Sequence, residues 1–259
     1  MISIDHTEVI KGLFYFLRIG AILLVTPYFG EKVVPVQVRV LLTIALTLFV
    51  FPMVSGNTFV PHGKPLLEYV FMGLREVLIG VTVGFMAKLI FEGIIMAASL
   101  VGYQMGFGTA NLLFPGSDDQ MNAFTLFHRL IVLLIFLSMN LHYIFINAIS
   151  ETFSVVPIGH SFPEENIAQY MLLVTSQIFV IALQLSTPIL IALLLTVAAL
   201  GLIARTVPQM NVFTMSFPLS FFIGLFTYLV TTMYFPEWLK NYYLNQGRQL
   251  FEGIHLMHP

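Results

Sequence analysis

The sequence has no cysteine, a single tryptophan and very few charged residues. Of its 259 residues, only 9% are Asp, Glu, Lys or Arg, and 58% are hydrophobic. A soluble globular domain carries about 25% charged residues, so this chain has too little polar surface to cover a water-soluble core. The absence of cysteine excludes disulfides, thiolate metal sites and cysteine nucleophiles. We therefore expect the chain to lie in lipid or against other apolar subunits.

Charge and motif patterns exclude several functions. The formal net charge is −2 and no basic stripe is present, which argues against a nucleic-acid partner. Metalloprotease, EF-hand and phosphate-loop motifs are all missing. His128 and His142 lie in one apolar run, but they are about four helical turns apart, too far to share a metal ion. We expect no metal, no cofactor and no catalytic site.

Long apolar runs predict membrane helices, because a membrane barrel would show short alternating segments instead. The runs cover residues 9–27, 40–54, 66–105, 123–149, 167–204 and 212–236. A spanning helix needs about 20 residues, so runs 66–105 and 167–204 are nearly twice that length. Each predicts two helices, a bent helix or a helix leaving the membrane plane, and "STP" at 186–188 interrupts the second. The expected fold is all-α: a polytopic integral membrane protein of long helices and helical hairpins, forming one domain over 1–259.

The chain ends in a segment that is expected to be amphipathic. Over residues 237–259, apolar and aromatic residues such as Trp238 and Tyr242 alternate with polar ones such as Lys240 and Arg248. A helix of this kind can lie at a membrane interface.

The most informative segment is 102–122, "GYQMGFGTANLLFPGSDDQMN", which separates two apolar runs. Its glycines and the Pro115-Gly116 dipeptide interrupt the helical pattern. Yet the segment keeps large apolar side chains that a water-facing loop would not need: Met105, Phe107, Leu112, Leu113 and Phe114. Irregular backbone at membrane depth is tolerated only where protein buries it or where it lines a wet cavity. Two interpretations stay open: an apolar loop inserted into protein, or a membrane-surface loop with interfacial aromatics.

Four ionisable residues lie inside the run 66–105: Arg75, Glu76, Lys88 and Glu92. Charges at membrane depth are costly and usually face a partner or water. They are candidates for a proton or ion relay, or for intramembrane ion pairs. Lys88 and Glu92 have the i,i+4 spacing of a helical ion pair, and Arg75 would pair with an acid on a neighbouring helix. We favour pairing, because structural ion pairs often mimic functional sites.

Two glycine pairs have the small-xxx-small spacing that lets helix backbones approach closely. They are Gly80 with Gly84, and Gly102 with Gly106. This spacing predicts tight packing of these helices against protein.

Three stretches of the chain, in this order and at these spacings, resemble the FliR family. They are "GYQMGFGTANLLFPGSDDQMNAFTLF", "FLSMNLHYIFINAISETFSVVPIG" and "ARTVPQMNVFTMSFPLS". FliR is the R-type subunit of the flagellar type III export gate, and injectisome subunits are related to it. The resemblance covers essentially the whole chain, and "TVPQMNVF" favours a flagellar member over an injectisome one.

The resemblance implies a non-enzymatic subunit of the bacterial inner membrane and the flagellar basal body. Its partners would be P-type and Q-type subunits in a closed helical assembly, the B-type switch subunit, other export apparatus proteins and lipid. Much of this assembly rises out of the bilayer plane, so the two long runs would be helical hairpins. Unfolded flagellar proteins would be exported, driven by proton motive force with help from a separate ATPase.

In the family, a loop at the position of residues 106–122 plugs the export pore. The resemblance therefore assigns the gate to Gly106, Phe107, Gly108, Leu112, Leu113, Phe114, Pro115 and Gly116, with apolar contact and dewetting as the seal. Gly102, Gly106 and Gly108 would be its hinge.

Two rival functions remain. A small-solute secondary transporter would use the helix break at 186–188 and the four embedded charges, although the matching halves of many transporters are missing. A purely structural assembly factor would need no plug.

Overall fold

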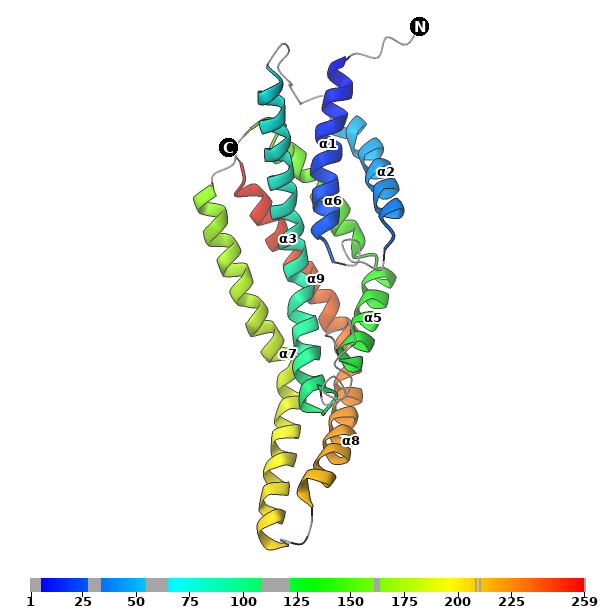
Figure 1. The fold of residues 1–259 in the computed structure, drawn as a ribbon, viewed down its shortest axis with the longest axis vertical. Helices are drawn as coiled ribbons and strands as arrows, with labels where there is room; N and C mark the ends of the chain where they lie inside the picture. The colour runs from blue at the N-terminus through cyan, green and yellow to red at the C-terminus, as the bar shows by residue number, and fades with distance from the viewer. Residues whose placement is uncertain are drawn as a thin grey trace. The chain divides into compact units, whose positions relative to one another are not determined.

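Helices are the only regular elements in the part of the chain that this computed structural model describes. That part comprises residues 6–27, 34–54, 65–108, 122–160, 164–207, 209 and 211–258. The helices found there (Figure 1) are α1 (His6–Val25), α2 (Val36–Val54), α3 (Leu66–Gln104), α5 (Ala123–Ser138), α6 (His142–Val155), α7 (Glu164–Thr206), α8 (Val212–Thr232) and α9 (Phe235–His255). The prediction of an all-α fold is confirmed.

Among the described helices, four are long and apolar enough to cross a membrane: α2, α3, α7 and α8. Helices α5 and α6 qualify together as a bent pair, which brings the number of candidate spans to as many as five. Helix α1 is not among them, because Glu8, Lys11 and Arg18 interrupt its apolar sequence. The prediction of a polytopic membrane protein is confirmed, although the first apolar run carries more charge than a typical spanning helix.

Each of the two over-long runs forms one continuous helix. Helix α3 has 39 residues and α7 has 43, so the hairpin expected inside each run is wrong. At 1.5 Å per residue, α7 is about 60 Å long. This length is roughly twice the hydrocarbon thickness of a bilayer, so part of α7 extends beyond the apolar layer.

The break expected at 186–188 is also wrong, because α7 continues through Pro188. The hydroxyl of Ser186 donates to the carbonyl of Ala182 at 2.7 Å, and that of Thr187 donates to the carbonyl of Leu183 at 2.5 Å. These carbonyls precede the one that Pro188 leaves without an amide donor, that of Gln184, and membrane helices tolerate such a gap where neighbouring protein or water satisfies it. One of the two motivations for a solute transporter, a helix broken at this point, is therefore removed; the other is the set of four embedded charges.

Contacts divide the chain into two compact units. Unit 1 contains Met1–Phe91, His142–Thr175 and Leu244–Pro259, and unit 2 contains Glu92–Leu141 and Ser176–Tyr243. Helices α3, α7 and α9 each contribute to both units. The single domain expected over 1–259 stays a prediction, and the units are described separately.

In unit 1, α1 packs tightly against α3 at two glycines. A Cβ atom on Gly80 would lie 2.6 Å from the carbonyl oxygen of Arg18, and one on Gly84 would lie 2.7 Å from that of Ile22. Only glycine allows backbones to approach this closely, so the tight packing predicted from this glycine pair is confirmed. Helix α2 lies beside α1 and also contacts α6 (Figure 1).

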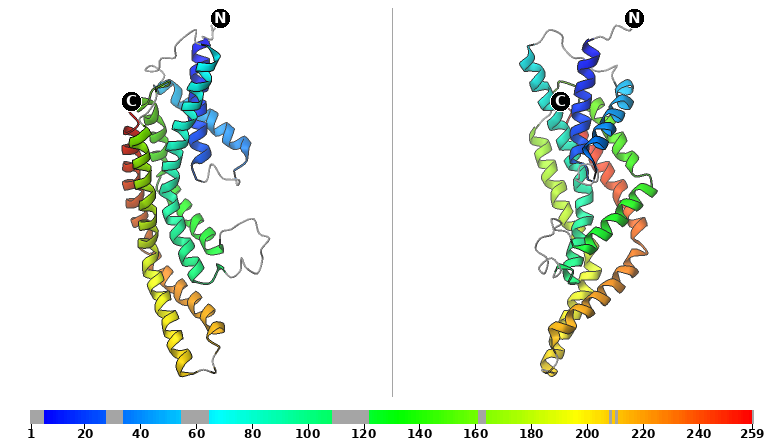
Figure 2. Two further views of the ribbon diagram at one scale, coloured as in Figure 1. Left: turned by 60° about the vertical axis from the view of Figure 1, so that its left-hand side comes forward. Right: turned by 45° about the vertical axis from the view of Figure 1, so that its right-hand side comes forward.

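In unit 2, α8 lies beside the second part of α7 as its antiparallel neighbour (Figure 2). These helices share a core with the end of α3 and the start of α5. Its buried members are Ala98, Val101, Met105, Phe124, Ile189, Leu193 and Tyr228. No charged side chain belongs to this cluster. The end of α3 and the start of α5 are therefore part of a purely apolar and aromatic core.

The amphipathic tail is helix α9, and its apolar face packs on protein. Leu239 and Tyr243 are buried in unit 2, and Leu250 and Ile254 are buried in unit 1. The alternating pattern of the sequence thus corresponds to a helix with one buried face, as an amphipathic period of 3.6 residues requires.

Candidate functional site where α3 ends and α5 begins

Helix α3 ends in a Schellman motif, at the point where the segment 106–122 starts. The amide of Phe107 donates to the carbonyl of Gly102 at 3.0 Å, and that of Gly106 donates to the carbonyl of Tyr103 at 3.1 Å. Gly106 has a φ of +94°, a conformation that other residues rarely adopt. Gly106 therefore sets the direction in which the chain leaves α3.

Helix α5 starts with Asn122 as its N-cap. The side-chain oxygen of Asn122 accepts hydrogen bonds from the amide of Thr125 at 2.8 Å and from its hydroxyl at 2.9 Å. This cap satisfies one of the free amides at the helix start. Asn122 is only 1% exposed, and its Nδ2 atom has no hydrogen-bond partner among the described residues. The start of α5 is thus anchored inside the protein.

The end of α3 and the start of α5 meet at Gly102. A Cβ atom on Gly102 would lie 2.8 Å from Cγ of Asn122, so any larger residue would push the two helix ends apart. The residues that flank 109–121 on both sides are therefore packed against each other.

Aromatic rings of α5 and α8 pack against the residues at the end of α3. The ring centroid of Phe107 lies 6.0 Å from that of Phe124 and 5.7 Å from that of Phe221. A Cβ atom on Gly106 would lie 2.6 Å from the ring of Phe217. Such offset and tilted ring pairs each add stability beyond their buried area. We call Gly102, Gly106, Phe107, Asn122 and Phe124 the loop base.

Only part of the expected gate falls on described residues. Gly106, Phe107 and Gly108 belong to the loop base or lie next to it, whereas Leu112, Leu113, Phe114, Pro115 and Gly116 lie outside the described residues. The glycines have close neighbours: Gly102 meets Asn122, Gly106 meets Phe217, and Gly108 meets the ring of Tyr103. Their lack of a side chain serves close packing here, and the hinge stays a prediction.

Unit 1 contains a buried ion pair between Arg18 and Glu76. The Nε atom of Arg18 donates to Glu76 at 2.6 Å, and both side chains are 0% exposed. Its Nη1 atom donates to the carbonyls of Thr152 and Val156, each at 2.8 Å, and its guanidinium lies 4.4 Å from the ring centroid of Phe153. The pair therefore joins α1, α3 and the end of α6.

The other three charges of the run 66–105 have different environments. Arg75 is exposed and forms no ion pair with the residues that the structure describes, and its pairing with an acid on a neighbouring helix stays a prediction. Lys88 and Glu92 are half-buried on α3, and their mutual pairing stays a prediction. Sequence reasoning did not identify Arg18 as the partner of Glu76, although both are isolated charges in apolar runs.

The loop base has no chemistry for bond making. No cluster of potential metal ligands occurs in the described ranges, and the residues of the loop base carry no titratable group. Such a set of side chains can position a segment and exclude water.

Asn122, which anchors the start of α5, was missed from the sequence, although Asn before an apolar run is a typical N-cap signal.

The sequence matches known export proteins over most of its length. The profile of the family described as bacterial export proteins, family 1, matches residues 9–245. Flagellar biosynthetic protein FliR of Bacillus subtilis (strain 168) is 30% identical over 225 residues, which cover 84% of each chain. The chain belongs to the FliR family of bacterial export proteins.

Other FliR proteins show similar likeness. FliR of Escherichia coli (strain K12) is 29% identical over 211 residues, covering 81% of this chain and 79% of its own. FliR of Aquifex aeolicus (strain VF5) is 28% identical over 233 residues, covering 88% and 87%. This FliR-family chain is thus a component of flagellar protein export and a multi-pass protein of the bacterial inner membrane.

Proposed function

We propose that this chain is a gate subunit of the flagellar type III export channel and that residues 106–122 close its pore. The observation that carries the proposal is the loop base. An apolar segment leaves α3 through a fixed glycine cap and re-enters at a buried N-cap. A seal needs this kind of support, because a segment with loose ends would not return to one closed position.

The seal works by apolar contact. Phe107 is anchored among aromatic rings, and Leu112, Leu113 and Phe114 follow it in the sequence. Hydrophobic constrictions block ions by dewetting. The chain needs no cofactor, metal or catalytic residue for this task, and we assign it no enzymatic activity.

The chain acts in a hetero-oligomer. Its partners are P-type and Q-type export-gate subunits, the B-type switch subunit and other export apparatus proteins, and unfolded flagellar proteins are its cargo. Large apolar side chains exposed on the described helices, such as Leu48, Leu195 and Phe226, support burial against lipid and partner helices.

The test is ion leakage across the inner membrane, measured in cells in which assembly of the complex is also checked. Deletion of residues 110–117 should raise leakage while the complex still forms. Replacement of Phe107, Leu113 and Phe114 by serine should do the same. The matched control is Phe226→Ser, because Phe226 is 70% exposed and does not belong to the loop base.

If the complex assembles in both loop variants and does not leak ions, residues 106–122 are not the seal. That result would favour the assembly-factor function, in which the loop can change without consequence. Binding or transport of a small solute by the isolated chain would instead revive the transporter.

A further inference from the structure

Unit 2 contains a cavity with aromatic walls that the proposed gate does not use. Its volume is about 240 Å³, and α3, α5, α7, α8 and α9 line it. Tyr234, which is 75% exposed, also borders it, so the cavity reaches the surface of the unit. For scale, an engineered apolar cavity of about 150 Å³ binds benzene. This cavity can therefore hold one substituted aromatic ring.

Two pairs of aromatic rings contribute to its wall. Phe124 meets Tyr228 edge to face, with ring centroids 5.0 Å apart. On the other side, the Phe235 ring stacks with that of Trp238 at 6.2 Å. Rings prefer offset or edge-to-face neighbours, so these walls favour an aromatic guest over a straight hydrocarbon chain.

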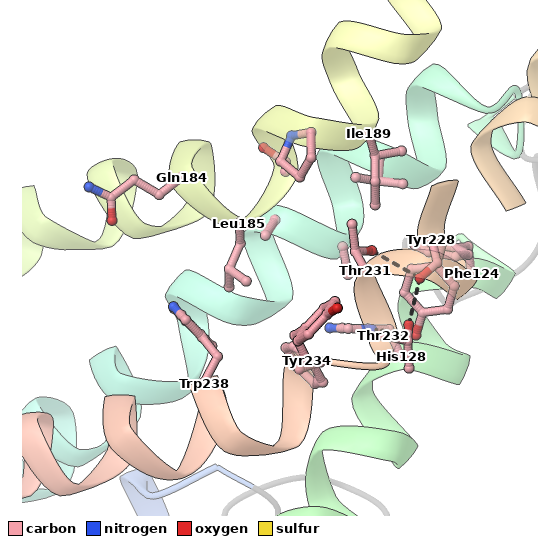
Figure 3. Close-up of a pocket in the computed structure, with 16 residues that line it drawn as sticks. Phe124, His128, Gln184, Leu185, Ile189, Tyr228, Thr231, Thr232, Tyr234 and Trp238 are labelled. Carbon is pink, nitrogen blue, oxygen red and sulfur yellow. Dashed lines mark hydrogen bonds between the residues drawn. The ribbon is translucent and has the colours of Figure 1, made fainter. Parts of the chain in front are cut away.

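His128 contributes a polar ring nitrogen to the wall of the cavity. Its Nδ1 atom lies 2.9 Å from the hydroxyl oxygen of Tyr228, and the side chain is only 6% exposed. Figure 3 shows His128 among the side chains that line the cavity. Its other nitrogen, Nε2, has no hydrogen-bond partner among the described residues. Nε2 is not one of the buried unpartnered atoms of the described residues, so it keeps accessible surface on the cavity wall, where a guest can bond to it.

The hydrogen bond to Tyr228 leaves two options for Nε2. If the tyrosine hydroxyl donates to Nδ1, Nε2 carries the proton and donates; if Nδ1 donates, Nε2 accepts. A guest hydroxyl fits both cases, because a hydroxyl donates and accepts.

We propose that this cavity binds one aromatic ring carrying a hydroxyl group, either a tyrosine side chain of another polypeptide or a free phenolic compound. The ring lies between the Phe124–Tyr228 pair and the Phe235–Trp238 pair, and its hydroxyl bonds to Nε2 of His128. This binding is independent of the sealing role proposed for 106–122, because it requires only the residues of the cavity.

The chain carries its own reporter of binding. Trp238 is the only tryptophan in the sequence and lies on the cavity wall. The full-length protein in a detergent-free amphipathic polymer is titrated with p-cresol, the analogue of the tyrosine side chain, and with toluene, which lacks the hydroxyl. The expected result is a saturable change in tryptophan fluorescence, with p-cresol binding roughly fivefold tighter than toluene, the effect of one hydrogen bond.

Two variants test the site separately. Ala98→Leu fills the cavity and should abolish saturable binding of both probes, whereas Ala198→Leu, the same change at an exposed site on α7, should leave binding unchanged. His128→Phe keeps a ring but removes Nε2, so the preference for p-cresol should fall to about one. Circular dichroism confirms that each variant is folded.

Three outcomes would overturn the proposal: fluorescence that changes only linearly with either probe, equal binding in Ala98→Leu, or an unchanged preference in His128→Phe. A titration with N-acetyl-tyrosinamide separates the two sources of the ring. If it binds like p-cresol, the cavity accepts a tyrosine on a polypeptide; if only p-cresol binds, the guest is a free phenol.

Discussion

Units 1 and 2 each contain a point at which helices cross closely, but different chemistry holds the helices at these points. In unit 1, α1 crosses α3 beside a fully buried pair of charges, Arg18 and Glu76. In unit 2, the ends of α3 and α5 meet beside the rings of Phe107 and Phe124.

The difference has a physical consequence for each unit. A buried ion pair tolerates one arrangement only, because loss of either partner leaves an uncompensated charge. A cluster of rings gains stability from many small contacts, and each ring pair contributes only about 0.5–1.5 kcal/mol. Unit 1 therefore depends strongly on one pair of charges, whereas in the loop base each ring contact contributes little and the strict positions are the glycines.

The largest effect is expected from breaking the charge pair. Glu76→Ala leaves the Arg18 guanidinium buried without its carboxylate, and the free energy of unfolding should fall by about 3–5 kcal/mol. Reversible unfolding in mixed detergent micelles measures this change. Replacing both partners, as Arg18→Met with Glu76→Leu, should restore much of the loss. If the single and double variants are equally destabilised, the loss of stability does not come from the unpaired charge of Arg18.

Gly106→Ala addresses the corresponding point in unit 2. A side chain at positive φ costs about 1–2 kcal/mol, and the new Cβ would overlap the ring of Phe217. We expect a total loss of about 3 kcal/mol in the same unfolding assay, since overpacking adds about 1–3. The control is Gly201→Ala on α7, where nothing lies within 4 Å and stability should rise slightly. Equal behaviour of the two variants would show that the glycine cap does not set the loop direction.

A smaller effect is expected at the glycine contact of unit 1. Gly80→Ala places a Cβ against the Arg18 carbonyl, a backbone atom that cannot move aside alone. Overpacking costs about 1–3 kcal/mol, partly offset by the higher helix propensity of alanine, so a loss of about 1–2 is expected. Gly12→Ala, in open space on α1, is the control, and thermal melting of the two proteins compares them.

The smallest effect should come from the cap of α5. Asn122→Ala removes an N-cap, which costs about 1 kcal/mol. Asn211 caps α8 with a longer bond of 3.3 Å to the Thr214 amide and is exposed, so Asn211→Ala should cost less. Hydrogen exchange at the first turns of α5 and α8 would show the difference. A larger loss at Asn211 would mean that burial of Asn122 contributes nothing.

Much of the fold follows from the sequence alone. Composition and run length predict a polytopic helical protein, and the spacing of Gly80 and Gly84 predicts tight packing. Gly102 and Gly106 also pack closely against protein, but Gly106 in addition ends helix α3 at positive φ. Local pattern does not reveal this difference.

Other features depend on contacts between residues that lie far apart in the sequence. Helix α7 continues through Pro188, and Ile189 and Leu193 on the following turn are buried in the core of unit 2, a contact that the local sequence does not show. Arg18 and Glu76 are 58 positions apart, so their pairing requires the tertiary fold. The glycines and large apolar residues of the sequence mark the segment 102–122 as unusual. Only the resemblance to a family assigns it the role of a pore plug.

The distance along the chain between Arg18 and its partners also constrains how the protein is made. Helix α1 leaves the ribosome with an arginine that would cost about 2.5–3.5 kcal/mol at the centre of a bilayer. Its carboxylate partner follows 58 residues later, and the carbonyl of Thr152 follows 134 residues later. At about 5–20 residues per second, α1 waits for seconds before Glu76 is synthesised. Until then Arg18 lacks the partners that it has in the folded protein, so α1 completes its packing against α3 and α6 only after Thr152 has been made.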